Sequence, residues 1–144
     1  MEMKAIRKAS GIAPRRVLVV EDDSLLALAL EDALTQAGVM HVTICPSAAL
    51  AMAALEDGSP DAMIISVHLA DRDDGWALAE LAAFLGPKPP KIIFSTASAG
   101  EIPTEVARLG TIFEKPYDPV SLVDRLIGPS DGGLFTRFRE ALHR

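Results

Sequence analysis

Four apolar runs in this sequence end in side chains that could bind a cation or a phosphoryl group. They deliver Glu21, Asp22 and Asp23 after RVLVV, Ser66 at the end of DAMIIS, Thr96 at the end of KIIFST, and Lys115 after TIFE. Carboxylate oxygens are hard ligands of the kind that Mg²⁺ prefers. Hydroxyls can hydrogen-bond an anion, and a lysine ammonium can compensate the charge of a phosphoryl group. These residue types form a candidate ligand site, provided that the four runs end at one edge of the fold.

The elements that must position these side chains alternate between strand and helix patterns. We expect strands at 16–20, 40–45, 61–67, 91–96 and 111–114, and helices at 24–37, 48–57, 75–85, 103–109 and 119–127. The first strand is apolar on both faces, as is typical of a central strand in a parallel sheet. The alternation predicts an α/β fold, with helices on both faces of a parallel sheet and right-handed crossovers. Ligands of such sheets bind beyond the carboxyl ends of the strands, where the four runs deliver their side chains.

Polar residues ahead of the helix patterns are the expected N-caps, because their side chains accept hydrogen bonds from free backbone amides. We expect caps from Asp73 or Asp74 before the helix at 75–85, and from Ser24, Ser47 and Asp118 before three other helices. Pro103 suits the first turn of its helix.

The chain length of 144 residues predicts one domain that is large enough to bury a core. We place a basic arm at 1–15, the domain at 16–128 and a tail at 129–144. The tail carries an amphipathic pattern, which predicts either a short helix folded onto the domain or a docking or dimer helix.

Charge and composition exclude several classes of function. The net charge is −6 although the N-terminal arm is basic, so the body is acidic and unsuited to direct binding of nucleic acid. The single cysteine, Cys45, fits a reducing cytoplasm and is expected to be a small buried hydrophobic residue. No signal peptide is visible, and no apolar stretch is long enough to span a membrane. We therefore expect a cytoplasmic protein without membrane contact.

In order and spacing, the strand-end motifs resemble the receiver domain of two-component response regulators, the CheY-like superfamily. VLVVEDD resembles the family's first strand, PDAMIISVHL the third, FSTA the fourth and FEKP the fifth. The resemblance implies a flavodoxin-like five-stranded sheet in the order 2-1-3-4-5. It implies that Glu21 and Asp22 are metal-site acids and that Thr96 and Lys115 bind phosphoryl oxygens. It also implies a cis bond before Pro116.

The sequence departs from this family at the phosphoacceptor, an aspartate that ends the third strand and takes a phosphoryl group from a histidine kinase with the help of Mg²⁺. Ser66 stands at that position. An aspartate is ionised at pH 7, whereas a serine hydroxyl is neutral and needs a neighbouring base. The missing carboxylate also weakens metal binding, so we expect no required cofactor and at most weak Mg²⁺ binding.

Other residues near this position offer no clear replacement. Asp71, Asp73 and Asp74 follow in the loop and are interpreted as turn formers and helix caps. His68 points the same way as Ser66 on an extended strand, but a surface position is the favoured interpretation. Ile112 occupies the place of the family's switch aromatic, so the aromatic side chain whose rotamer change serves as the usual switch is missing.

Three hypotheses follow. The first is an atypical, stand-alone receiver domain, not an enzyme, that binds a signalling protein such as a histidine kinase or a downstream effector without aspartate phosphorylation. The second is a working phosphoacceptor that uses Ser66 or one of Asp71, Asp73 and Asp74. The third, and least favoured, is a Mg²⁺-dependent phosphohydrolase. A homodimer is left open.

Overall fold

The centre of the computed structural model is a five-stranded parallel sheet in the order β2-β1-β3-β4-β5. The structure describes residues 13–128. The strands are β1 (Arg16–Val20), β2 (His41–Cys45), β3 (Ala62–Ser66), β4 (Lys91–Thr96) and β5 (Gly110–Glu114). The helices are α2 (Ser24–Gln36), α3 (Ala48–Glu56), α4 (Ala77–Ala83), the 3₁₀ turn η1 (Ala99–Glu101), α5 (Thr104–Ala107) and α6 (Pro119–Ile127).

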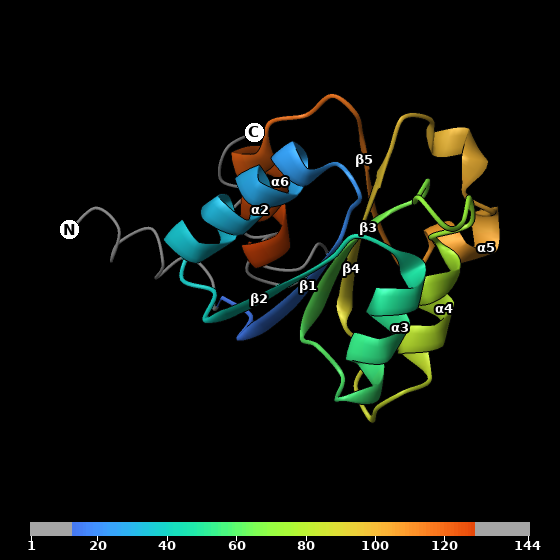
Figure 1. Ribbon diagram of the computed structural model, residues 1–144, viewed down its shortest axis with the longest axis horizontal. Helices are drawn as coiled ribbons and strands as arrows, with labels where there is room; N and C mark the ends of the chain where they lie inside the picture. The colour runs from blue at the N-terminus through green and yellow to red at the C-terminus, as the bar shows by residue number, and fades with distance from the viewer. Residues whose placement is uncertain (1–12, 129–144) are drawn as a thin grey trace, which may run out of the picture.

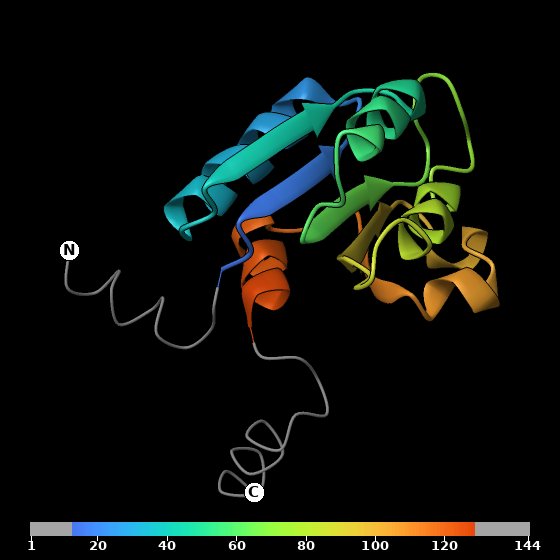
Figure 2. The same ribbon diagram turned by 90° about the horizontal axis from the view of Figure 1, so that it is seen from below.

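Helices cover both faces of this sheet. α2 and α6 lie on one face, and α3, α4 and α5 lie on the other (Figure 1). The strands run side by side in one direction (Figure 2), so their carboxyl ends meet at one edge. The predicted flavodoxin-like, doubly wound fold is confirmed.

The two layers of helices enclose separate apolar cores. Along β1, Leu18 and Val20 pack into the core under α3, α4 and α5, whereas Val17 and Val19 pack into the core under α2 and α6. All four side chains are buried. This burial on both faces explains why the strand reads as a continuous apolar run.

Two predicted helix caps are present and two predictions are wrong. Ser47 caps α3 by accepting from the Leu50 amide, and Asp118 caps α6 by accepting from the Val120 amide. Ser24 is not the cap of α2, because the Asp23 carboxylate accepts from both Leu25 and Leu26 and so places the cap one residue earlier. Asp73 and Asp74 do not cap α4, whose N-cap is Trp76 without a side-chain hydrogen bond.

The helix predicted at 103–109 is shorter and follows a separate 3₁₀ turn. Pro103 has an extended backbone and precedes the first turn of α5 instead of lying within it. The predicted tail at 129–144, with its helix, and residues 1–12 of the predicted arm lie outside the described residues. Among residues 13–128, no helix is long and apolar enough to cross a membrane.

Candidate functional site

The parallel register brings Glu21 and Ser66 together at the carboxyl edge of the sheet. Val20 pairs with Ile65 between β1 and β3, so the residues that follow each, Glu21 and Ser66, are the next neighbours across these strands. Both are buried, at 2% and 1% exposure. A buried polar side chain needs a hydrogen-bond partner, and this pair supplies one for each member.

Glu21, Ser66 and Lys115 form one hydrogen-bonded cluster, which we call the Glu21 cluster. The Ser66 hydroxyl donates to Glu21 Oε1. Lys115 Nζ lies 3.0 Å from the same oxygen and 3.4 Å from Ser66 Oγ. The second carboxylate oxygen, Oε2, accepts from the Asp23 amide at 3.0 Å. Both oxygens of Glu21 are therefore engaged by groups of the chain itself.

Asp22 lies beside this cluster on the exposed side. Its pKa is raised, first by burial and then by hydrogen bonding to Glu21 and by the charge of Glu21. Lys115 acts in the opposite direction, because its positive charge favours the ionised carboxylate. The raised pKa means that desolvation and the neighbouring Glu21 together outweigh the effect of Lys115 on Asp22.

The cluster does not fit the oxygen shell that Mg²⁺ requires. Mg²⁺ takes near-octahedral oxygen ligands at short distances. Here β3 contributes a neutral hydroxyl, and both oxygens of Glu21 are already engaged. Within residues 13–128, no three acids, histidines or cysteines are grouped as metal ligands.

Thr96 lies at the end of β4, but its hydroxyl is used by its own loop. It donates to the Ser98 carbonyl and accepts from the Ser98 amide, each at 3.1 Å. The structure therefore brings together three of the predicted site residues, Glu21, Ser66 and Lys115. Thr96, at the end of the neighbouring strand β4, is not part of this cluster, because its hydroxyl is hydrogen-bonded to Ser98.

Asp71 is tied to a helix that it does not precede in the chain. Its two carboxylate oxygens accept from the amides of Ala48 and Ala49, at 2.9 and 3.1 Å, at the start of α3. We call this contact the Asp71 clasp. These amide hydrogen bonds, that of Ala48 first, lower the pKa of Asp71. Asp71 thus binds the first amides of α3, which Ser47 caps, and the prediction that it serves the helix that follows its own loop is wrong.

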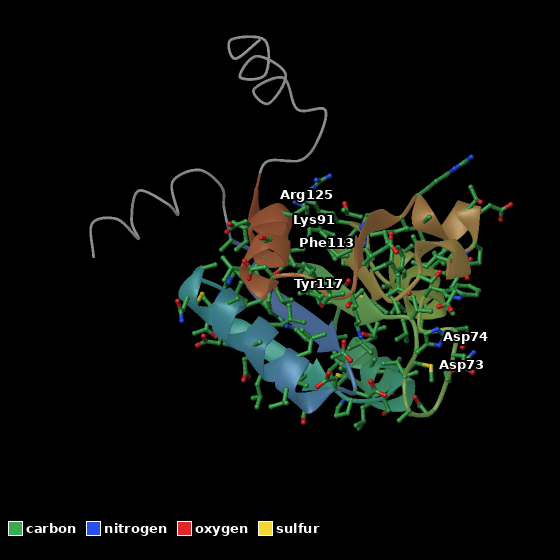
Figure 3. All side chains as sticks on the ribbon, turned by 90° about the horizontal axis from the view of Figure 1, so that it is seen from above. Asp73, Asp74, Lys91, Phe113, Tyr117 and Arg125 are labelled. Atoms are coloured by element: carbon green, nitrogen blue, oxygen red, sulfur yellow. The ribbon has the colours of Figure 1, made fainter. Side chains whose placement is uncertain are left out.

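The other two loop acids also have partners away from Ser66. Asp74 forms two hydrogen bonds of 2.7 Å with the Arg72 guanidinium, which lowers the pKa of Asp74. Asp73 lies 3.4 Å from His68 Nδ1 and is almost fully exposed. Figure 3 shows Asp73 and Asp74 close to each other on the loop and well apart from Tyr117, which lies on the α6 side of the sheet.

Gly75 closes this loop against the end of β3. Its amide donates to the Val67 carbonyl at 2.8 Å. A Cβ at Gly75 would lie 2.1 Å from the Ser66 carbonyl oxygen, so only glycine fits this approach. The loop is therefore held at both Asp71 and Gly75.

His68 is exposed and does not serve Ser66 as a base. Its Nε2 lies 2.5 Å from Glu101 Oε2 in η1. The hydrogen bond to Glu101, followed by that to Asp73, raises the pKa of His68. The surface position favoured from the sequence is the observed one.

Sequence reasoning missed a hydrogen-bonded pair of hydroxyl groups on the same face of the sheet as Ser66. Ser95, which pairs with Ser66 in register, is hydrogen-bonded to the Tyr117 hydroxyl at 2.9 Å. Phe113 packs edge-on against Tyr117, with ring centroids 5.9 Å apart. Burial raises the pKa of Tyr117 to about 12. The signal that could have found this pair is the position of Ser95, opposite Ser66 in neighbouring strands.

Two other predictions concern residues in and just after β5. Ile112 is half-buried and packs against the core under α3, α4 and α5. The peptide bond between Lys115 and Pro116 is cis.

Comparison with known proteins agrees with this architecture. Residues 17–127 match the family model of the response regulator receiver domain. A curated relative, protein-glutamate methylesterase/protein-glutamine glutaminase 3 of Rhodospirillum rubrum, is 28% identical over 110 residues, which are 74% of this chain. The match spans only 30% of the length of that relative.

Solved receiver domains resemble the structure closely. A CheY-like receiver domain from Methylobacillus flagellatus superposes with a TM-score of 0.65 at 26% identity, covering 75% of this chain and 92% of the other. A receiver protein from Sinorhizobium medicae gives a TM-score of 0.65 at 27% identity, covering 77% and 90%. Because the family model covers every strand of the sheet and the fold is that of solved receivers, the chain belongs to the response regulator receiver domain family.

Proposed function

We propose that this receiver domain works in two-component signal transduction as a protein-interaction module, without phosphorylation on an aspartate. The observation that carries the proposal is the Glu21 cluster, in which β3 ends in the neutral hydroxyl of Ser66. The partner would be a signalling protein, such as a histidine kinase or a downstream effector. The domain would act as a cytoplasmic binding surface and not as an enzyme.

The chemical argument concerns the nucleophile. An aspartate at this strand end would be ionised at pH 7 and could attack a phosphoryl group directly. The loop acids Asp71 and Asp74 are engaged with the start of α3 and with Arg72. Asp73 lies beside His68 on the exposed side of the loop. None of these three carboxylates replaces the missing one at the end of β3.

A second candidate function has one observation in its favour. The Ser66 hydroxyl donates to the Glu21 carboxylate, and a carboxylate can accept a proton from an attacking hydroxyl. Against this role, the Lys115 ammonium lies 3.0 Å from the same Glu21 oxygen that would have to accept the proton. Ser66 is also 1% exposed, which hinders access by a phosphoryl donor.

Intact-mass measurement after incubation with acetyl phosphate and Mg²⁺ tests the proposal. We expect no added phosphate on the native protein, with a conventional receiver domain as the positive control for the donor. Phosphate mapped to Ser66, Asp71, Asp73 or Asp74 would instead support the working-acceptor hypothesis. Turnover of a phosphomonoester would support the phosphohydrolase.

Binding to a purified histidine kinase of the same organism tests the interaction role. Calorimetric titration should give the same affinity with and without the phosphoryl donor. An affinity that changes on adding the donor would contradict a module that works without phosphorylation.

A further inference from the structure

We propose that the Lys115 ammonium is the resident cation of this site and that it makes the domain indifferent to Mg²⁺. The inference deepens the proposed function by assigning the regulation of the same site. Its test uses no phosphoryl donor, so the two proposals can fail separately.

The first step concerns the donors that already bind the two carboxylate oxygens of Glu21. Oε1 receives the Ser66 hydroxyl and the Lys115 ammonium, and Oε2 receives the Asp23 amide. A metal ion that bound Glu21 would have to displace at least one of these donors. Displacement of the Asp23 amide would also disturb the N-terminus of α2, because Asp23 is its cap. Metal binding therefore competes with contacts that hold the fold.

The second step is the charge. Glu21 and Asp22 contribute two negative charges and Lys115 one positive charge, and Ser66 adds none. A dication entering next to the ammonium would meet strong repulsion at the short distances of this cluster. An additional carboxylate at position 66 would supply the missing negative charge, whereas the serine does not.

The third step is what happens when the ammonium is removed. Glu21 is buried, whereas the Lys115 side chain is 32% exposed and reaches the cluster from the residue that follows β5. Lys115→Met keeps the length and apolar character of the side chain but leaves two neighbouring acids without a cation. Such a pair binds Mg²⁺ more readily than the native cluster, because the repulsive neighbour is gone and Oε1 keeps only the Ser66 hydroxyl as a donor.

The experiment compares thermal unfolding in EDTA and in millimolar MgCl₂ for four proteins. They are the native protein, Lys115→Met, Ser66→Asp and the control Lys88→Met, which removes an exposed ammonium in the α4–β4 loop. The native protein and the control should show no shift in Tm on adding Mg²⁺. Lys115→Met and Ser66→Asp should each rise by about 5 °C when Mg²⁺ is about ten times its Kd.

Either of two unfolding results would overturn the inference. One is a Mg²⁺-dependent rise of the native protein as large as that of Ser66→Asp. The other is a folded Lys115→Met that gains nothing from Mg²⁺. If Lys115→Met does not fold, Lys115→Gln takes its place, since it keeps a donor to Glu21 without the charge. A titration of the native protein with MgCl₂, followed by Trp76 fluorescence, provides the independent readout, and a saturating change would again contradict the inference.

Discussion

Replacing Lys115 by methionine should destabilise the domain even where no metal is present. The substitution keeps an unbranched apolar side chain and removes the ammonium that lies 3.0 Å from Glu21 Oε1. Glu21 stays in place at 2% exposure, with the Ser66 hydroxyl and the Asp23 amide as its remaining donors. The variant therefore holds a buried carboxylate that has lost its only neighbouring positive charge within the cluster.

The size of the effect can be bounded from the geometry. Two unit charges 3.0 Å apart attract by about 5 kcal/mol at an effective dielectric constant of about 20. Removing one partner of a fully buried pair costs about 3–5 kcal/mol. Lys115 is 32% exposed, so water already screens part of the attraction and part of its hydration is retained. We expect a loss of about 2–3 kcal/mol, which is a fall in Tm of about 10 °C.

Urea unfolding of a double-mutant cycle measures this quantity. The cycle consists of the native protein, Lys115→Met, Glu21→Gln and the double variant, with Lys88→Met as the control for losing a surface lysine. Because Glu21→Gln removes the charge that Lys115→Met leaves unpaired, the double variant should be more stable than the sum of the two losses predicts. We expect a coupling above about 1 kcal/mol. Additive effects, or a Lys115→Met variant as stable as the control, would refute the ion pair as a source of stability.

Three further predictions test the loop that follows β3. Gly75→Ala should lose at least about 2 kcal/mol because its new Cβ meets a backbone carbonyl oxygen 2.1 Å away, whereas Gly100→Ala has open space and should be neutral by urea unfolding. An NMR titration should give His68 a pKa above the ordinary value of about 6.5, and Glu101→Gln should lower it; an unchanged value would exclude this hydrogen bond as the cause. The stabilisation from His68 is present below its ordinary pKa and is lost as pH rises through the raised one. Asp71→Asn should destabilise at neutral pH, because the amides of Ala48 and Ala49 favour the ionised carboxylate and so lower its pKa. The difference from the native protein should shrink as pH falls below about 4 and be lost as pH passes through the lowered pKa; a pH-independent difference would contradict the clasp.

The strands of the parallel sheet were predictable because each carries a strong local pattern, whereas their order in the sheet was implied by the resemblance to the family. The apolar run Val17–Val20 is buried on both faces, and this is the feature that distinguishes a central parallel strand in sequence. The convergence of Glu21, Ser66 and Lys115 followed from the rule that parallel strands end at one edge. These inferences need no knowledge of side-chain conformation.

The details that were missed depend on contacts between residues far apart in the chain. Asp71 was expected to act locally, but its carboxylate reaches Ala48, which is 23 residues away. A cap provided by a residue far away along the chain cannot be recognised from the sequence next to the helix. Ser24 and Asp23 are both good caps, and only the backbone geometry decided for Asp23. Sequence spacing alone can therefore predict that a helix has a cap, but it is less able to predict which residue provides that cap.

The Asp71 clasp has a consequence for how a partner of this domain would be mapped by hydrogen–deuterium exchange. The amides of Ala48 and Ala49 are shielded by a carboxylate from the β3–α4 loop and not by a turn of their own helix. A partner that moved this loop away from the start of α3 would expose both amides to solvent and speed their exchange. A footprint at the start of α3 would then report movement of a loop elsewhere, and reading it as the docking surface would place the partner on the wrong part of the protein.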